Sequence, residues 1–172
     1  MKRLQILIIV MVGLLATATA RADQIRALLT GYEETPAAVS TTGGGEFVAT
    51  IDPDGDAIHY TETFSGLQGT VTQSHIHVGQ LSITGSIVIF LCQTSTNPDP
   101  TGLAPQCPQE GTVTGDITAA NVIAGATATQ QLEAGDLAAV ITAIRAGAAY
   151  ANVHTNLSPG GEIRGQIRTA SK

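Results

Sequence analysis

The feature that most constrains the fold of this chain is an alternation of apolar and polar side chains between Arg26 and Leu91. β-Branched or aromatic residues alternate with polar ones, and a period of two is typical of strands with one buried face. The run Asp52-Pro53-Asp54-Gly55-Asp56 predicts a hairpin turn, because Pro presets φ early in a turn and Gly supplies a positive φ later. Strands are predicted over residues 24–29, 45–51, 57–64 and 87–91.

The pattern changes near residue 137, where apolar residues recur at the spacing of one helix face: Leu137, Val140, Ile141 and Ile144. Gly135 or Asp136 can cap the start of this helix, and Gly147 stands where a left-handed C-terminal cap belongs. Further strands are predicted over 113–117, 149–154 and 161–168, and Ile163 and Ile167 of the last one face the core. We therefore expect a mainly β protein, an antiparallel sandwich with one helix near 136–146.

The N-terminus has the three parts of a secretory signal peptide. Lys2 and Arg3 precede an apolar stretch over residues 4–15, and small residues follow up to Ala22. The apolar stretch is shorter than the roughly 20 residues that a membrane-spanning helix needs. We expect residues 1–22 to be removed, with Ala20 as the second cleavage position, which leaves residues 23–172 as one domain with no membrane attachment.

Removal of residues 1–22 makes the chain strongly acidic. It takes away three of the eight Lys and Arg residues, so five remain against 14 Asp and Glu, a formal net charge of −9. Such a surface repels phosphate backbones, and the chain has no basic run to overcome this repulsion. Nucleic acid is therefore not an expected partner.

Two cysteines, Cys92 and Cys107, flank a segment rich in Pro, Asn and Gln. An even pair around a flexible loop in an exported chain predicts a disulfide bond. Together with the signal peptide, this pair predicts a secreted or periplasmic protein.

Three of the four histidines have the spacing of a metal site. His75 and His77 stand one residue apart, and in a strand such residues point to the same face. His154 ends another predicted strand and can supply a third ring. Imidazole ligands suit copper, with zinc as the second choice. The alternative is that His75 and His77 form structural hydrogen bonds at a sheet edge. His59 falls on the solvent face of its strand.

Three charged residues are candidates to support that site. Glu62 shares the inward face of its strand with Tyr60 and Phe64, where a carboxylate needs a partner. Glu162 and Arg164 lie on one face of the last predicted strand, and we expect Arg164 to neutralise Glu62.

Three segments resemble the signature of the CHRD domain, a module named for its repeats in chordin: Ser74-His75-Ile76-His77-Val78-Gly79, Tyr150-Ala151-Asn152-Val153-His154-Thr155 and Gly161-Glu162-Ile163-Arg164-Gly165. The resemblance runs from Leu29-Thr30-Gly31-Tyr32-Glu33-Glu34-Thr35-Pro36 to Ile167. It implies an exported domain of unsettled function that is associated with binding in the animal protein.

Gly66-Leu67 followed by His75-Ile76-His77 is also similar to the copper site of Cu,Zn superoxide dismutase, where a His-x-His and a distant His bind copper. That similarity implies His75, His77 and His154 as copper ligands, and a Greek-key sandwich of the superoxide dismutase or immunoglobulin type. The chain lacks the bridging His and the acidic zinc ligands, so the similarity favours a mononuclear site.

Three functions follow as hypotheses. The first is an exported metal-binding protein that holds copper through His75, His77 and His154. The second is an extracellular protein-interaction module without metal. The third is a copper oxidoreductase of the superoxide dismutase type, which the acidic surface disfavours because it repels superoxide.

Overall fold

The computed structural model describes residues 22–170, so the predicted signal peptide lies almost entirely outside the described residues. Within this part the chain forms nine strands, one α-helix and three short 3-10 helices. The strands are β1 (Asp23–Thr30), β2 (Gly44–Ile51), β3 (Ile58–Ser65), β4 (Val71–Val78), β5 (Ser86–Cys92), β6 (Gly111–Ile117), β7 (Ala149–Thr155), β8 (Ile163–Gln166) and β9 (Arg168–Thr169); the helices are α1 (Leu137–Arg145), η1 (Gly31–Glu33), η2 (Ala119–Asn121) and η3 (Ala128–Gln130).

Each strand that the sequence predicts is present, with ends that shift by a residue or two. In β1 and β3 buried and exposed residues alternate, as expected for strands with one face toward a core. The turn after β2 is a hairpin turn as predicted: the Gly55 N–H donates to the Asp52 carbonyl over 3.0 Å, and Gly55 has a φ of +74°.

The strand predictions do not include β4, although His75 and His77 are predicted to share one face only because a strand is assumed at these residues. The predicted strand over 161–168 is interrupted: β8 ends at Gln166, and Ile167 donates its N–H to the Ala149 carbonyl before β9 begins. Ile163 and Ile167 are both fully buried in the core, as expected.

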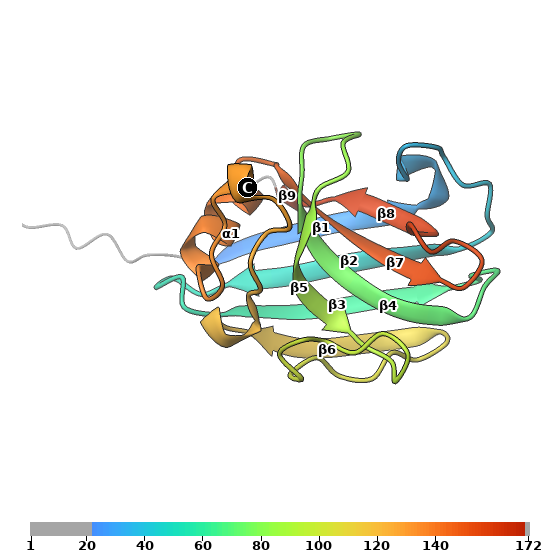
Figure 1. The fold of residues 1–172 in the computed structure, drawn as a ribbon, viewed down its shortest axis with the longest axis horizontal. Helices are drawn as coiled ribbons and strands as arrows, with labels where there is room; N and C mark the ends of the chain where they lie inside the picture. Colours follow the sequence, from blue (N-terminus) through green and yellow to red (C-terminus); the bar gives the residue numbers. More distant parts are fainter. Residues whose placement is uncertain (1–21, 171–172) are drawn as a thin grey trace, which may run out of the picture.

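All the strands pair antiparallel in the order β5-β4-β7-β8-β1-β2-β3-β6, with β9 beside β1. Figure 1 shows that this sheet folds over on itself, so that β5, β4, β7 and β8 cover β1, β2, β3 and β6. Contacts between the two ends of the sheet nearly close it into a barrel. The Tyr60 hydroxyl donates to the Leu91 carbonyl of β5 over 2.6 Å, and the Ile123 N–H donates to Val88 over 2.9 Å.

The helix α1 lies at one end of the two layers (Figure 1) and buries the four residues that define its predicted face. Asp136 is its N-cap and accepts a hydrogen bond from the Ala139 N–H over 2.9 Å. At the other end Gly147 has a φ of +70°, and the N–H groups of Gly147 and Ala148 bond back to Ile144 and Ala143. This pattern is a Schellman cap, as the sequence predicts.

The predicted disulfide between Cys92 and Cys107 is present and joins the end of β5 to a loop. Inside the enclosed loop the Asp99 carboxylate accepts hydrogen bonds from the backbone N–H groups of Thr101, Leu103 and Ala104. The loop is therefore held both by a covalent bond and by hydrogen bonds to a buried carboxylate. As for membranes, no helix within residues 22–170 combines the length and the apolar character needed to cross one.

Candidate metal centre

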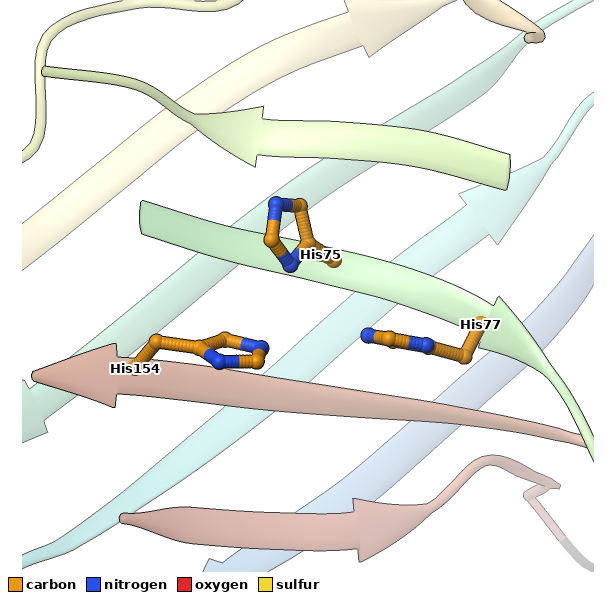
Figure 2. A group of neighbouring side chains, drawn as sticks. All are labelled: His75, His77 and His154. Atoms are coloured by element: carbon orange, nitrogen blue, oxygen red, sulfur yellow. The ribbon is translucent and has the colours of Figure 1, made fainter. Parts of the chain in front are cut away.

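The three histidines lie on one face of two neighbouring strands. His75 and His77 belong to β4 and His154 to β7, and β4 pairs with β7 so that His75 lies opposite Asn152. Ile76 and Val153, one position away, point to the core between the layers. The rings therefore lie on the outer face of their layer, and Figure 2 shows them together above β4 and β7. β4 is flanked by β5 and β7, so these histidines are not at a sheet edge.

Loops cover this outer face and bury the rings. His75, His77 and His154 are 0%, 6% and 5% exposed. The loop after β4 provides the Gly85 carbonyl that contacts His77, and the loop after β7 provides the Pro159 carbonyl that contacts His154. Strands that are buried on both faces therefore hold the histidines almost completely out of contact with solvent.

The rings are close enough to share one ion. The centroid of the His75 ring lies 5.5 Å from the centroid of the His77 ring and 4.9 Å from that of the His154 ring. One nitrogen from each ring lies within 4.8 Å of a nitrogen of the other two. Three nitrogens arranged trigonally around an ion at about 2.0 Å would be about 3.5 Å apart. A rearrangement of about 1 Å would therefore bring all three into the coordination distance of one metal.

Hydrogen bonds to backbone carbonyls orient two of the rings. His77 Nδ1 lies 3.0 Å from the Gly85 oxygen and His154 Nδ1 lies 2.8 Å from the Pro159 oxygen, so each Nδ1–H donates to a carbonyl. In a neutral ring the lone pair then remains on Nε2. Metal-binding histidines are usually held in this way by a hydrogen bond from the other nitrogen.

The remaining nitrogens are largely without partners. His77 Nε2 and both nitrogens of His75 are buried with no hydrogen-bond partner among residues 22–170. His154 Nε2 lies 3.1 Å from Asn152 Oδ1, but a neutral His154 can donate only once and its shorter contact is the one to Pro159. Buried polar atoms normally find partners, so this set is the part of the molecule that a bound ion would satisfy.

Burial keeps the three rings uncharged. It lowers the pKa of His75 well below its ordinary value, lowers that of His77 to about 4 and lowers that of His154. At neutral pH the rings therefore present lone pairs rather than positive charges, and neutral imidazole is the form that binds metals.

A comparison with models of protein families matches the CHRD domain over residues 25–167. This chain belongs to the CHRD domain family. Comparisons with curated proteins and with solved structures give no match. The matched range includes most of β1 and all of β2 to β8, and therefore all three histidines.

Aromatic side chains pack against the His cluster in this CHRD domain. Phe90 of β5 meets the ring of His75 edge-on, with 4.3 Å between centroids. Tyr150 stacks on His77 at 4.6 Å, and the guanidinium of Arg164 lies 3.4 Å from the centroid of the Tyr150 ring. Arg164 thus acts on the cluster through Tyr150, and its charge contributes to the low pKa of His77.

The expected pairing of Arg164 with Glu62 is wrong. Arg164 Nη1 donates to the Thr35 hydroxyl over 2.7 Å and Nη2 donates to the Ile83 carbonyl over 3.1 Å, on the outer face of the sheet. Glu62 is fully buried on the other side, between the layers, where its hydrogen-bond partner is the Ser74 hydroxyl at 2.9 Å. The inward face of Glu62 is as predicted, and its position beside Ser74 places it behind His75 rather than beside the rings.

Glu162 likewise contacts a neighbour of the histidines rather than the rings themselves. Its carboxylate accepts hydrogen bonds from the Thr155 and Thr41 hydroxyls and from the backbone of Gln68 and Gly69. Burial raises its pKa, but these four hydrogen bonds outweigh burial and hold the pKa below its usual range. Glu162 therefore fixes the loops around Thr155, the neighbour of His154.

Sequence reasoning missed Phe90, Tyr150 and Asn152, which contact the rings, and the buried carboxyl group of Glu34. Glu34 is buried beside Arg164 and Asn152, and burial raises its pKa to about 7 against the opposing charge of Arg164. Its Oε1 has no hydrogen-bond partner within the described chain. Glu34 stands in a loop inside the Leu29–Pro36 segment of the CHRD resemblance, which is the one signal that marks it.

His59 is exposed, as predicted from its strand position. It lies between Asp116 and Asp52, with its nitrogens 2.6 and 3.2 Å from their carboxylates, and the hydrogen bond to Asp116 raises its pKa most. His59 is a surface residue of β3 apart from the His cluster, which makes it a suitable control for tests of that cluster.

Proposed function

We propose that this CHRD-domain protein is an exported metal-binding protein that holds a copper ion, or in second place a zinc ion, through His75, His77 and His154. The observation that carries the proposal is the convergence of three buried, neutral rings whose inward nitrogens are largely without partners. Glu62, Glu162 and Arg164 support the site indirectly, through Ser74, Thr155 and Tyr150.

The residues of the site have separate tasks in this proposal. The Gly85 and Pro159 carbonyls orient His77 and His154, and the Phe90 and Tyr150 rings exclude water. The bound ion supplies Lewis acidity, and for copper the capacity to carry one electron.

The substitution His75→Leu tests the proposal most sharply. His75 makes no hydrogen bond to any residue in 22–170, so a Leu of similar size leaves no polar partner unsatisfied and preserves the fold. We expect the affinity for Cu(II) or Zn(II), measured by calorimetric titration of residues 23–172, to fall by more than about 100-fold.

His59→Leu is the matched control, because it removes an exposed histidine and leaves the cluster intact. Circular dichroism establishes that both variants are folded. Equally weak binding of Cu(I), Cu(II) and Zn(II) by the wild type, His75→Leu and His59→Leu would overturn the proposal. Elemental analysis of untagged protein from the exported fraction then identifies the metal.

Export is part of the same proposal. Residues 1–22 have the pattern of a signal peptide, β1 begins at Asp23, and a disulfide such as Cys92–Cys107 persists in oxidising compartments. These observations support a secreted or periplasmic location.

A protein-interaction module is the second candidate, and one observation favours it. Large apolar side chains are exposed on the loops that cover the cluster: Tyr32, Leu81, Ile83 and Leu157. An extracellular partner that packs on these loops would need no metal. The two candidates are separated by chelation, because the interaction module would retain both stability and binding to its partner.

Oxidoreductase chemistry of the superoxide dismutase type receives less support. It requires an open coordination position for the substrate, whereas the three rings are almost completely buried. A Greek-key class of immunoglobulin or superoxide dismutase type likewise remains a proposal about the fold.

A further inference from the structure

The second inference concerns which ion the His cluster accepts, and it rests on the proposed function. The donor set itself is uncharged. Within residues 22–170, no carboxylate or thiolate joins the group formed by His75, His77 and His154. An ion bound there would therefore keep its full charge, because neutral imidazoles neutralise none of it.

No carboxylate belongs to the ligand group within residues 22–170, and Glu162 contacts Thr155 rather than the rings. A positive charge lies close by, because the Arg164 guanidinium is 3.4 Å from the centroid of the Tyr150 ring, which stacks on His77. Glu34 is buried near Arg164, and burial raises its pKa to about 7 against the charge of Arg164, so at neutral pH it carries only part of a negative charge. Glu62 lies on the far side of β4 and contacts Ser74. A cation in the cluster would thus have no carboxylate among its ligands, with Arg164 one ring away.

Because the site is buried, the charge of the ion strongly affects the free energy of binding it. The cost of transferring an ion out of water scales with the square of its charge, so a divalent ion loses about four times as much solvation as a monovalent one. Zn(II) also takes four ligands as a rule. The fourth would be Asn152 Oδ1, 3.1 Å from His154 Nε2, or a water with little access, because His75 is inaccessible to solvent and His77 and His154 are only 6% and 5% exposed. Cu(I) carries a single charge and accepts a low coordination number.

We propose that the cluster of His75, His77 and His154 binds copper as Cu(I), in preference to Cu(II) and Zn(II). The protein is then a carrier of reduced copper whose loops shield the ion from water. Substrate access to the ion is not required for this task, in agreement with the buried position of the rings.

Competition titrations test the preference. Residues 23–172 with the disulfide intact are titrated with Cu(I) against bicinchoninate, without oxygen and with ascorbate rather than a thiol as reductant. Cu(II) and Zn(II) are titrated against chelators of known affinity. We expect a Kd for Cu(I) at least about 100-fold below that for Zn(II), or about 2.7 kcal/mol.

The outcomes separate this inference from the proposed function. If Zn(II) or Cu(II) binds as tightly as Cu(I) and His75→Leu abolishes binding, the Cu(I) preference is wrong and the metal site stands. If none of the three ions binds more tightly to the wild type than to His75→Leu, both proposals are wrong.

A charge substitution tests the physical cause. Asn152→Asp keeps the size of the side chain and places a carboxylate 3.1 Å from His154 Nε2. Combined with Glu34→Gln, it replaces the carboxyl group of Glu34 by one beside the ring of His154, so the number of carboxyl groups is unchanged. We expect the double variant to narrow the gap between Cu(I) and Zn(II) by at least tenfold, with Glu34→Gln alone as the control. An unchanged gap in a folded double variant would refute the charge argument.

Discussion

Of the three rings, His75 has the most nitrogen atoms without a hydrogen-bond partner. Both of its nitrogens are buried without partners in the described chain, whereas His77 and His154 each donate one N–H to a carbonyl. Each buried polar atom without a partner costs about 1–3 kcal/mol. The metal-free domain therefore carries a local cost that a bound ion would remove, so that binding and stability are coupled.

Glu62 and Ser74 form a second polar contact that depends on a proton. The Ser74 hydroxyl lies 2.9 Å from both Glu62 Oε1 and the Asn152 carbonyl oxygen, but a hydroxyl has one hydrogen to donate. Burial raises the pKa of Glu62 to about 8, so at neutral pH its carboxyl group is protonated and donates to Ser74. Ser74 then donates to Asn152, and each of these hydrogen bonds has its own proton.

The substitution Glu62→Gln should change the pH dependence of stability. The folded pKa of about 8 exceeds the ordinary value of 4.5, so only the folded state holds the proton between these values. Stability is then full below about 4.5 and is lost as pH rises toward 8, by up to about 1.4 kcal/mol per pH unit. Urea unfolding at pH 5, 6.5 and 8 should show this loss in the wild type and a flatter profile in Glu62→Gln. Parallel profiles would contradict it.

Individual residues also mark the limits of prediction from the sequence. The His cluster could be predicted because His75 and His77 are close in sequence and share strand parity. Parity also separates Arg164 from Glu62, because Ile163 faces the core and its neighbour must face outward. Glu34 could not be placed from local pattern, since its loop reaches Asn152 and Arg164 only through the tertiary fold.

At the scale of elements, alternation of apolar and polar residues predicts strands that have one solvent-exposed face. In β1 and β3 exposed residues alternate with buried ones, and both strands are predicted. All seven residues of β7 are buried, and the His75–His77 stretch of β4 is buried on both faces because loops cover the outer one. Burial on both faces weakens the alternation of polarity in β4, which is missing from the strand predictions, whereas β7 is predicted although both of its faces are buried.

The helix α1 depends on its N-cap. Asp136 accepts from the Ala139 N–H, which otherwise has no partner in the first turn. Asp136→Ala should lower the free energy of unfolding by about 1 kcal/mol, measured by urea denaturation. Asp136→Ser retains an acceptor oxygen and serves as the control. An equal loss in both variants would show that the cap is not the cause.

The disulfide fixes the loop that follows β5. Cys92 and Cys107 are 15 residues apart in sequence, and closing a loop of this length stabilises by about 3 kcal/mol in the chain-entropy model. The double variant Cys92→Ala/Cys107→Ala should lose a free energy of unfolding of this size in chemical denaturation. A loss below about 0.5 kcal/mol would mean that the loop holds its shape without the bond.

At the scale of the whole molecule, the export proposal predicts cleavage after Ala22. Protein recovered from the periplasm or medium should have a mass that begins at Asp23, with a minor form from Arg21 if Ala20 is used. Intact mass measurement checks this and also detects the two hydrogens lost on disulfide formation. Retention of residues 1–22 in the recovered protein would refute the export proposal.

The position of β1 in the sheet has a consequence for the order of folding. β1 pairs with β2 on one side and with β8 and β9 on the other, so the first strand of the domain joins the last ones. The strand pairing that joins β1 to β7 through β8 cannot form until the C-terminal strands are available, and such distant pairing slows folding. In the proposed export, a chain still threading through a translocation channel would remain an incomplete sheet until its final residues emerged. Late completion of the sheet would keep such a chain unfolded during its passage.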